Sequence, residues 1–186
     1  MPIGNLKGLV GLVTGGASGL GKATVERFVR QGARVILCDL EKSPGKDVAD
    51  NLEADVKKAL EIAKDKFGKL DVAVNCAGIG IAFKTYNFNK KLPHNLDDFA
   101  EVITVNTIGS FNVIRLAVGL IGENQPDTDG QRGVVINTSS VAAFDGQMGQ
   151  AAYSASKGAI VGMTLPIARD LSNQGIQMLY YSPWFI

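Results

Sequence analysis

Short apolar runs alternate along this chain with longer amphipathic segments. The runs are rich in residues that favour strands, and the longer segments carry apolar residues at helical spacing. Strands that alternate with helices in this way predict a parallel sheet covered by helices on both faces, a doubly wound α/β fold of the Rossmann type. The expected strands are Leu9 to Val13, Arg34 to Asp39, Leu70 to Asn75, Val134 to Thr138 and Ile176 to Tyr181.

Helices are expected between these strands. Ser43-Pro44 opens one helical stretch, Val56 to Phe67 is helical again, and no strand can be found between the two. Pro166 should kink the last helix, because its ring removes a backbone donor and crowds the preceding turn. The other expected helices are Ala23 to Arg30, Asp97 to Gly119 and Ala151 to Leu171.

The length and composition fit one globular domain spanning residues 1–186. Nineteen basic side chains against eighteen acidic ones leave no global field to attract nucleic acid or an anionic membrane. The two cysteines, Cys38 and Cys76, stand in apolar runs and are expected to be reduced thiols of an intracellular protein. No window holds the roughly 18 uninterrupted apolar residues of a membrane span, which predicts a soluble protein.

In a parallel α/β sheet, ligands bind beyond the carboxyl ends of the strands, so the chemistry should follow those ends. The first strand leads into Thr14-Gly15-x-x-x-Gly19-x-Gly21, where small residues let backbone amides approach a pyrophosphate at a helix N-terminus. Glycine-rich turns also occur without a ligand. The predicted cofactor contacts in this loop are Gly15, Ser18, Gly19, Leu20 and Gly21.

Two further strand ends extend the predicted cofactor site. Asp39 stands eighteen residues beyond Gly21, where a carboxylate can bind the adenosine ribose hydroxyls and repel a 2′-phosphate. This favours NAD over NADP, although such an Asp can also merely cap a turn. The loop Asn75, Cys76, Ala77 and Gly78 permits a close approach to the ligand, and alone would read as an ordinary tight turn.

The catalytic hypothesis rests on Ser140, Tyr153 and Lys157. Tyr153 and Lys157 are four residues apart in a helical stretch, so their side chains share one face. A lysine and the positive nicotinamide would lower the tyrosine pKa from about 10, and the phenol could then exchange protons near neutrality. Ser140 follows a strand end, where its hydroxyl could orient the reacting carbonyl oxygen. Taken alone, a Tyr-x-x-x-Lys pair is common on protein surfaces and does not indicate a catalytic site.

Together, Thr14-Gly15-x-x-x-Gly19-x-Gly21, Asn75-Cys-Ala-Gly78, Asn106, Ser140 and Tyr153-Ser-Ala-Ser-Lys157 resemble the short-chain dehydrogenase/reductase family in order and spacing. The resemblance implies that Tyr153 is the general acid/base, Lys157 its partner and ribose anchor, and Ser140 the carbonyl orienter. Ser140 and Tyr153 would also bind substrate, and Tyr153 and Lys157 would contact NAD. The resemblance alone gives Asn106 its role of holding a water in the proton relay. Ser139, the adjacent serine, is not assigned this catalytic role.

A narrower resemblance runs from about Lys7 to Gln177. It is to the branch of the family that oxidises short and branched 3-hydroxyacyl-CoA thioesters and some hydroxysteroids. It implies an NAD-dependent mitochondrial homotetramer, which also serves in a transfer-RNA processing complex. Segments that carry it include Lys84-Thr-Tyr-Asn, Phe111-Asn-Val-Ile-Arg-Leu and Val141-Ala-Ala-Phe-Asp-Gly-Gln.

Two departures from the family pattern leave alternatives open. No third strand is visible, and Asp55-Val56, which resembles the adenine-contacting end of that strand, is expected to start a helix instead. After Pro183 there is no lid segment and no final strand. The chain could therefore be a non-catalytic shortened form acting as a scaffold or partner subunit, or a piece of a longer protein. Another alternative is a 3-oxoacyl thioester reductase using NADPH, against which Asp39 argues.

Two smaller features bear on other ligands. His94 is the single histidine and is expected to be solvent-exposed, so no metal site is predicted. Lys84, Lys90 and Lys91 form a modest basic patch that could meet a CoA phosphate, or could simply belong to a solvated loop.

Overall fold

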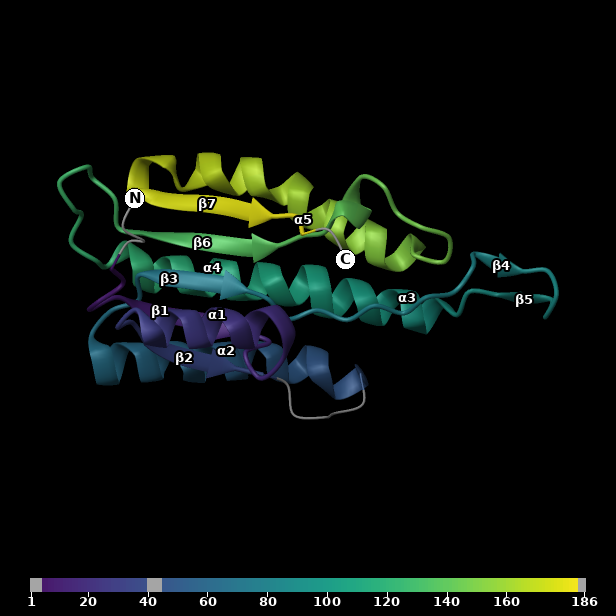
Figure 1. Ribbon diagram of the computed structural model, residues 1–186, viewed down its shortest axis with the longest axis horizontal. Helices are drawn as coiled ribbons and strands as arrows, with labels where there is room; N and C mark the ends of the chain where they lie inside the picture. The colour runs from purple at the N-terminus through teal and green to yellow at the C-terminus, as the bar shows by residue number, and fades with distance from the viewer. Residues whose placement is uncertain (1–4, 40–44, 184–186) are drawn as a thin grey trace.

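The computed structural model describes residues 5–39 and 45–183. Five parallel strands form one sheet in the order β2-β1-β3-β6-β7 (Figure 1). The Rossmann-like α/β fold predicted from the sequence is confirmed, and each predicted strand lies within two residues of its observed ends. The bounds are β1 Val10–Thr14, β2 Arg34–Cys38, β3 Val72–Asn75, β6 Gly133–Thr138 and β7 Ile176–Tyr181.

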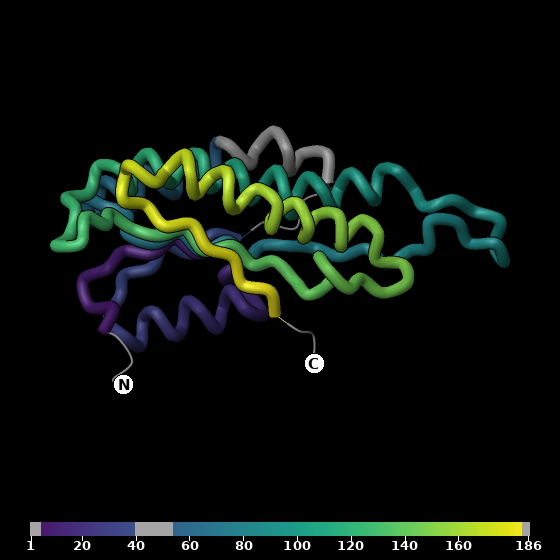
Figure 2. Tube along the Cα trace, turned by 90° about the horizontal axis from the view of Figure 1, so that it is seen from above, coloured from purple at the N-terminus to yellow at the C-terminus, as the bar shows by residue number. Residues whose placement is uncertain are grey.

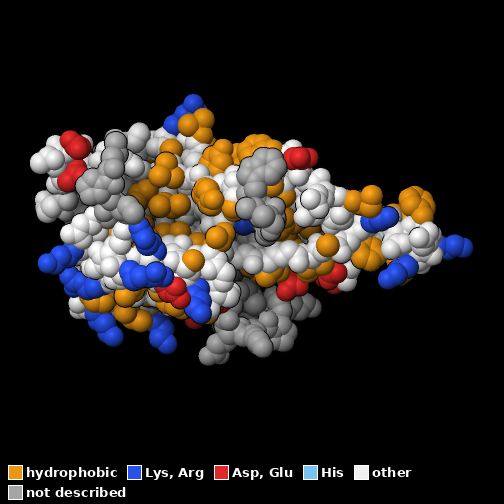
Figure 3. All heavy atoms as spheres, in the orientation of Figure 1, with side chains coloured by type: hydrophobic (Ala, Val, Ile, Leu, Met, Phe, Trp, Pro, Cys, Tyr) orange, Lys and Arg blue, Asp and Glu red, His pale blue; other side chains and the backbone are white. Residues whose placement is uncertain are grey.

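Helices cover the two faces of the sheet unequally (Figure 2). α1 (Gly19–Arg30) packs on β1 and β2 from one side, and three helices pack on the other side. On the α1 side the described residues leave β6 and β7 uncovered, so Leu179 and Tyr181 are exposed. Figure 3 views this face and shows hydrophobic side chains gathered there. The three helices of the covered face are α2 Gly45–Phe67, α4 Ser110–Gly122 and α5 Ala151–Asp170.

α2 corrects the prediction of two successive helices, because it is a single helix. Asp55 and Val56 therefore lie inside it rather than at the start of a new helix. Val56, Ala59 and Ala63 are buried at helical spacing, and this continuous contact with the core holds the helix together. Ser43-Pro44, expected to open the stretch, lies outside the described residues.

The predicted helix from Asp97 to Gly119 is observed over Leu96–Gly122, but in three parts. α3 (Leu96–Ile103) leads into a π-helical segment, Thr104–Gly109, and α4 follows. By length and composition this helix could cross a membrane. Half of its apolar window is buried in the protein, with Val102, Ile114 and Ile121 almost fully enclosed, as in a core helix.

The polar stretch from Lys84 to Asn95 contains a hairpin that the sequence did not indicate. β4 (Tyr86–Asn87) and β5 (Leu92–Pro93) pair antiparallel at the end of an arm that projects from the body (Figures 1 and 2). The expected exposure of His94 is wrong, because its ring packs near Phe83 and Phe99 with centroid distances of 5.8 and 6.3 Å. Tilted and edge-on contacts with these two rings at the base of the arm thus shield part of the imidazole from solvent.

Candidate functional site

The predicted cofactor and catalytic residues meet at one edge of the sheet. β1, β2, β3 and β6 all run toward this edge, because the strands are parallel. α5 crosses behind it and carries Tyr153 and Lys157. Residues from five separate parts of the chain are thereby brought within contact distance.

Two glycines of the first loop, Gly15 and Gly21, are required by close packing. Gly15 has a φ of +63°, and a Cβ there would lie 2.8 Å from the backbone of Ala77. A Cβ on Gly21 would collide with the carbonyl oxygen of Gly15. The loop therefore folds tightly against both the start of α1 and the loop that follows β3.

The N-terminus of α1 suits an anionic group. Its N-cap, Ser18, makes no side-chain capping hydrogen bond, and the first turn of the helix carries no acidic residue. The first backbone N–H groups of a helix have no intrahelical acceptors, and the helix dipole adds partial positive charge there. Gly19 and Leu20, also predicted to bind cofactor, are exposed at this end. The residues present therefore fit a dinucleotide pyrophosphate.

Asp39 lies beside the same loop. Its Oδ2 accepts a hydrogen bond of 2.8 Å from the backbone N–H of Ala17, and the Cys38 carbonyl accepts one of 3.2 Å from Gly16. The carboxylate is exposed to solvent. Asp39 thus holds the glycine loop, which neither sequence interpretation anticipated, and its contact with a ribose stays a prediction.

Thr14 joins the second loop to the first strand. Its Oγ1 accepts 3.2 Å hydrogen bonds from the N–H groups of Cys76 and Ala77. Gly78 faces the catalytic residues, since a Cβ there would lie 3.2 Å from Asn106 Oδ1 and 3.5 Å from Lys157 Nζ. Asn75, by contrast, is buried and donates to Asn137 Oδ1 at 2.8 Å, so its amide nitrogen serves the sheet.

The two cysteines differ in their surroundings, and both are free. Burial, with smaller contributions from Asp55 and Asp39, raises the pKa of the Cys38 thiol to about 11. That thiol stays protonated at neutral pH and is a poor nucleophile. Cys76 lies at the site, where its Sγ is 3.6 Å from Thr138 Oγ1.

Ser140, Tyr153 and Lys157 come together as the sequence predicted. Ser140 is fully buried, caps a short 3-10 helix by accepting from Ala142 N at 3.1 Å, and shares a side-chain hydrogen bond with Tyr153. Lys157 Nζ lies 5.6 Å from the centroid of the Tyr153 ring. It donates a 2.8 Å hydrogen bond to the carbonyl of Thr138, which fixes the ammonium at the end of β6.

The pKa shifts of Tyr153 and Lys157 bear on the predicted acid/base role. Burial raises the pKa of Tyr153, and the hydrogen bond with Ser140 lowers it only in part, so the protein alone does not produce the depressed value expected. Burial also lowers the pKa of Lys157 to about 8, opposed by a smaller contribution from Cys76. The positive charge of a bound nicotinamide is the remaining influence that would favour a Tyr153 phenolate.

Asn106 occupies the π-helical segment and is almost fully buried. Its Oδ1 accepts from Ile79 N at 2.8 Å, while its Nδ2 donates to Ile79 O and to Ser156 Oγ, both at 2.9 Å. Its own carbonyl accepts a 2.7 Å bond from Ser110 Oγ. The amide of Asn106 therefore uses its hydrogen bonds to hold Ile79 and Ser156 together. The water that Asn106 is expected to hold stays a prediction.

Two serines beside the catalytic residues have structural partners. Ser139, the serine without a predicted catalytic role, is buried and donates a 3.0 Å hydrogen bond to the carbonyl of Lys157. Ser156, which the sequence analysis did not single out, joins Asn106 to α5. Its position in the sequence could have indicated this role, because a serine in a helix can donate a hydrogen bond to the backbone carbonyl three residues earlier, here that of Tyr153.

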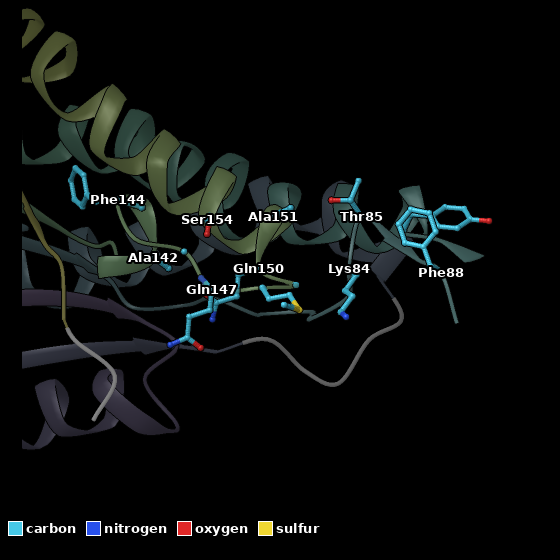
Figure 4. A pocket seen from close by; sticks show the side chains of 14 residues that line it. Lys84, Thr85, Phe88, Ala142, Phe144, Gln147, Gln150, Ala151 and Ser154 are labelled. Atoms are coloured by element: carbon cyan, nitrogen blue, oxygen red, sulfur yellow. Dashed lines mark hydrogen bonds between the residues drawn. The ribbon is translucent and has the colours of Figure 1, made fainter. Parts of the chain in front are cut away.

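A cavity of about 900 Å³ opens between the projecting arm and the segment leading into α5 (Figure 4). None of Ser140, Tyr153 and Lys157 lines it, but Ala142 and Ser154, which do, lie within two residues of Ser140 and Tyr153 in the sequence. Lys84 contributes a cation and Phe88 and Phe144 contribute aromatic rings. The full lining is Lys84, Thr85, Tyr86, Phe88, Ala142, Ala143, Phe144, Gly146, Gln147, Met148, Gly149, Gln150, Ala151 and Ser154.

The buried ammonium of Lys157 should make folding stability depend on pH. Its pKa falls from 10.5 to about 8 in the folded protein, so between these values the unfolded chain binds more protons and rising pH favours folding. Relative to Lys157→Met, we expect wild type to gain about 1 to 3 kcal/mol between about pH 7 and pH 10. Urea denaturation across this range measures it, and parallel curves for the two proteins would contradict it.

Comparison with known proteins gives three findings. A family described as short chain dehydrogenase matches residues 10–186. The 3-hydroxyacyl-CoA dehydrogenase type-2 of Drosophila melanogaster is 61% identical over 191 residues, covering 96% of this chain and 75% of that protein. The crystal structure of 3-hydroxyacyl-CoA dehydrogenase type-2 from Mycobacterium avium matches with a TM-score of 0.85 and 35% identity, covering 96% of this chain and 75% of that one.

One further solved structure bears on the cofactor. The 3-ketoacyl-(acyl-carrier-protein) reductase from Brucella melitensis, complexed with NADH, matches with a TM-score of 0.78 and 30% identity. The match covers 96% of this chain and 76% of that one. The chain thus spans about three quarters of the length of each of these relatives.

Proposed function

Because this chain belongs to the short chain dehydrogenase family, we propose that it oxidises the secondary alcohol of a 3-hydroxyacyl-CoA thioester to the ketone, with NAD as cofactor. The observation that carries the proposal is the hydrogen bond between Ser140 and Tyr153, with Lys157 over the same ring. The cavity beside the projecting arm includes Ser154, the residue after Tyr153, in its lining, and we infer that it receives the acyl thioester.

In the proposed oxidation the alcohol loses a hydride from its carbinol carbon and a proton from its hydroxyl. When bound, the nicotinamide supplies the acceptor for the hydride that leaves the carbinol carbon. Tyr153, as the phenolate, takes the proton of the hydroxyl, and the Ser140 hydroxyl donates to the same oxygen as it becomes a carbonyl. Lys157 keeps positive charge beside the phenol. In the reverse direction Tyr153 returns the proton to the carbonyl oxygen.

The substrate class is supported by the cavity and by the names of the relatives. Both 3-hydroxyacyl-CoA dehydrogenase type-2 relatives act on a 3-hydroxyacyl-CoA by name. In this chain Lys84 lines the cavity, and Lys90 and Lys91 are exposed on the same arm. Their ammonium groups suit the phosphates of CoA, and the apolar lining suits an acyl chain.

A direct assay tests the function. Purified protein is mixed with NAD and 3-hydroxybutyryl-CoA, and NADH formation is followed by absorbance, with free 3-hydroxybutyrate as the matched substrate without CoA. We expect turnover with the thioester and a much lower kcat/KM with the free acid. Absence of turnover in both directions, with intact cofactor binding, would overturn the proposal and favour the non-catalytic alternative.

Cofactor choice gives a second test, through Asp39. A 2′-phosphate of charge about −1.5 to −2 placed near this carboxylate is repelled by several kcal/mol at about 4 Å, before relaxation and screening. We expect NAD to bind at least about tenfold more tightly than NADP after screening. Asp39→Asn keeps an acceptor for Ala17 N and removes the charge, so it should erase most of this preference.

Equilibrium titration of both cofactors against wild type and Asp39→Asn measures this preference. Asp39→Ala serves as the control for the loop, because it also removes the hydrogen bond to Ala17 and should weaken both cofactors together. Equal wild-type affinities for NAD and NADP would show that Asp39 acts only as a turn cap.

A further inference from the structure

One hydroxyl joins the cofactor loop to the catalytic helix. Ser156 Oγ accepts a 2.9 Å hydrogen bond from Asn106 Nδ2 and donates one of 2.7 Å to the backbone carbonyl of Tyr153. The Asn106 amide also holds both the N–H and the C=O of Ile79, the residue after the Asn75–Gly78 loop. The bonds form a continuous path from Ile79 through Asn106 and Ser156 to Tyr153.

The π-helical segment strengthens this junction. Thr107, next to Asn106, donates from its Oγ1 to the carbonyl of Ser156 at 3.3 Å. Two successive residues of the segment therefore bond to a single residue of α5. Ser156 is completely buried, so no water replaces these partners without rearrangement. Ile79 offers both a donor and an acceptor, which fixes the orientation of the Asn106 amide.

We propose that Ser156 is a positioning residue for the reaction. It sets the place of Tyr153 relative to Ser140 and Lys157 and couples that place to the loop that faces the cofactor. Its hydroxyl touches neither substrate nor cofactor and acts through Asn106 and the Tyr153 main chain. This role rests on the proposed dehydrogenase function for its kinetic consequences, but the coupling itself is a property of the fold.

Removing the hydroxyl should change kinetics in a specific way. In Ser156→Ala, Asn106 Nδ2 loses one acceptor and the Tyr153 carbonyl loses one donor. We expect kcat to fall by about tenfold, because small displacements of a catalytic group cost large factors in rate. We expect KM for NAD to change by less than about threefold, since the glycine loop and Asp39 are untouched. As its bond with Ser140 loosens, the pKa of Tyr153 should rise, which moves the midpoint of the rise of kcat with pH to higher pH.

Two variants serve as controls. Thr164→Val removes a buried hydroxyl of the same helix that bonds back to the Ile160 carbonyl at 2.8 Å, without contact to Asn106. It should leave the pH midpoint unchanged even if it lowers stability. Ser156→Thr keeps the hydroxyl and should restore the wild-type midpoint. A Ser156→Ala midpoint equal to that of wild type would overturn the positioning role.

Hydrogen exchange provides a readout that needs no catalysis. The Ile79 amide is held by Asn106 Oδ1, so loosening Asn106 should speed its exchange in Ser156→Ala and leave it unchanged in Thr164→Val. If wild type shows no turnover, the proposed function fails while this measurement still decides the coupling. If the exchange rate of the Ile79 amide is unchanged in a folded Ser156→Ala protein, Ser156 is not coupled to Ile79 through Asn106, even if turnover falls.

Discussion

Tyr153→Phe should lower kcat by at least about a hundredfold, the range expected for loss of a general acid/base. Phenylalanine keeps the ring that packs against Gly80 and lies under the Lys157 ammonium, so the fold should tolerate the change. What disappears is the hydroxyl that hydrogen-bonds with Ser140 and that we propose as the group exchanging a proton with the substrate oxygen. Steady-state turnover of 3-hydroxybutyryl-CoA, with NADH binding measured in parallel, tests this result.

The control for this variant is its own cofactor affinity. Binding of NADH within about threefold of wild type would show that the site is intact. A folded Tyr153→Phe protein that keeps more than about a tenth of wild-type turnover would refute the assigned mechanism, since general acid/base catalysis contributes far more.

Ser140→Ala should reduce kcat by about a hundredfold or more, as removal of a donor to a developing carbonyl oxygen does elsewhere. The Ser140 bond lowers the pKa of Tyr153, so its loss should also raise that pKa and move the midpoint of the rise of turnover with pH to higher pH. Loss of the cap to Ala142 N should destabilise the fold by only about 1 kcal/mol.

Ser139→Ala is the matched control for Ser140. The two serines are adjacent and both buried, but Ser139 donates to the Lys157 carbonyl rather than to Tyr153. We expect it to lose less than about tenfold in kcat and to keep the wild-type pH midpoint. A larger loss in Ser139→Ala than in Ser140→Ala would reverse the two assignments.

The fold and the family could be predicted because their signals are local. β1 and β3 are short buried runs that end on polar or glycine-rich loops, so their positions and their shared edge follow from the chain itself. The loops at this edge are held by backbone contacts to Thr14 and Gly15 that depend on small residues at fixed spacing. The predicted family is confirmed by its match to residues 10–186.

The rest depended on contacts between distant segments. The role of Ser156 requires Asn106, fifty residues earlier, to lie beside it. The partial burial of His94 depends on Phe83 and Phe99, which lie beside its ring. The hairpin strands β4 and β5 have two residues each, too few to show an alternating pattern. Such features follow from packing that no single stretch of sequence specifies.

Several expectations drawn from the resemblance stay predictions. The homotetramer is supported by exposed apolar side chains on neighbouring helices, namely Ile108, Phe111 and Leu165. The mitochondrial location, the hydroxysteroid substrates and the transfer-RNA processing partners have no corresponding feature among the described residues.

The π-helical segment Thr104–Gly109 also sets the rotational phase of the helices on either side of it. α3 packs against α5, whereas α4 packs against α2 and the sheet. Each residue of an α-helix turns the chain by about 100°, so a wider turn offsets the face of α3 from that of α4. Deleting one residue here would restore regular α-helical spacing and would rotate one helix out of its contacts. The segment that carries Asn106 is thus also the one that lets a single long helix face two different neighbours.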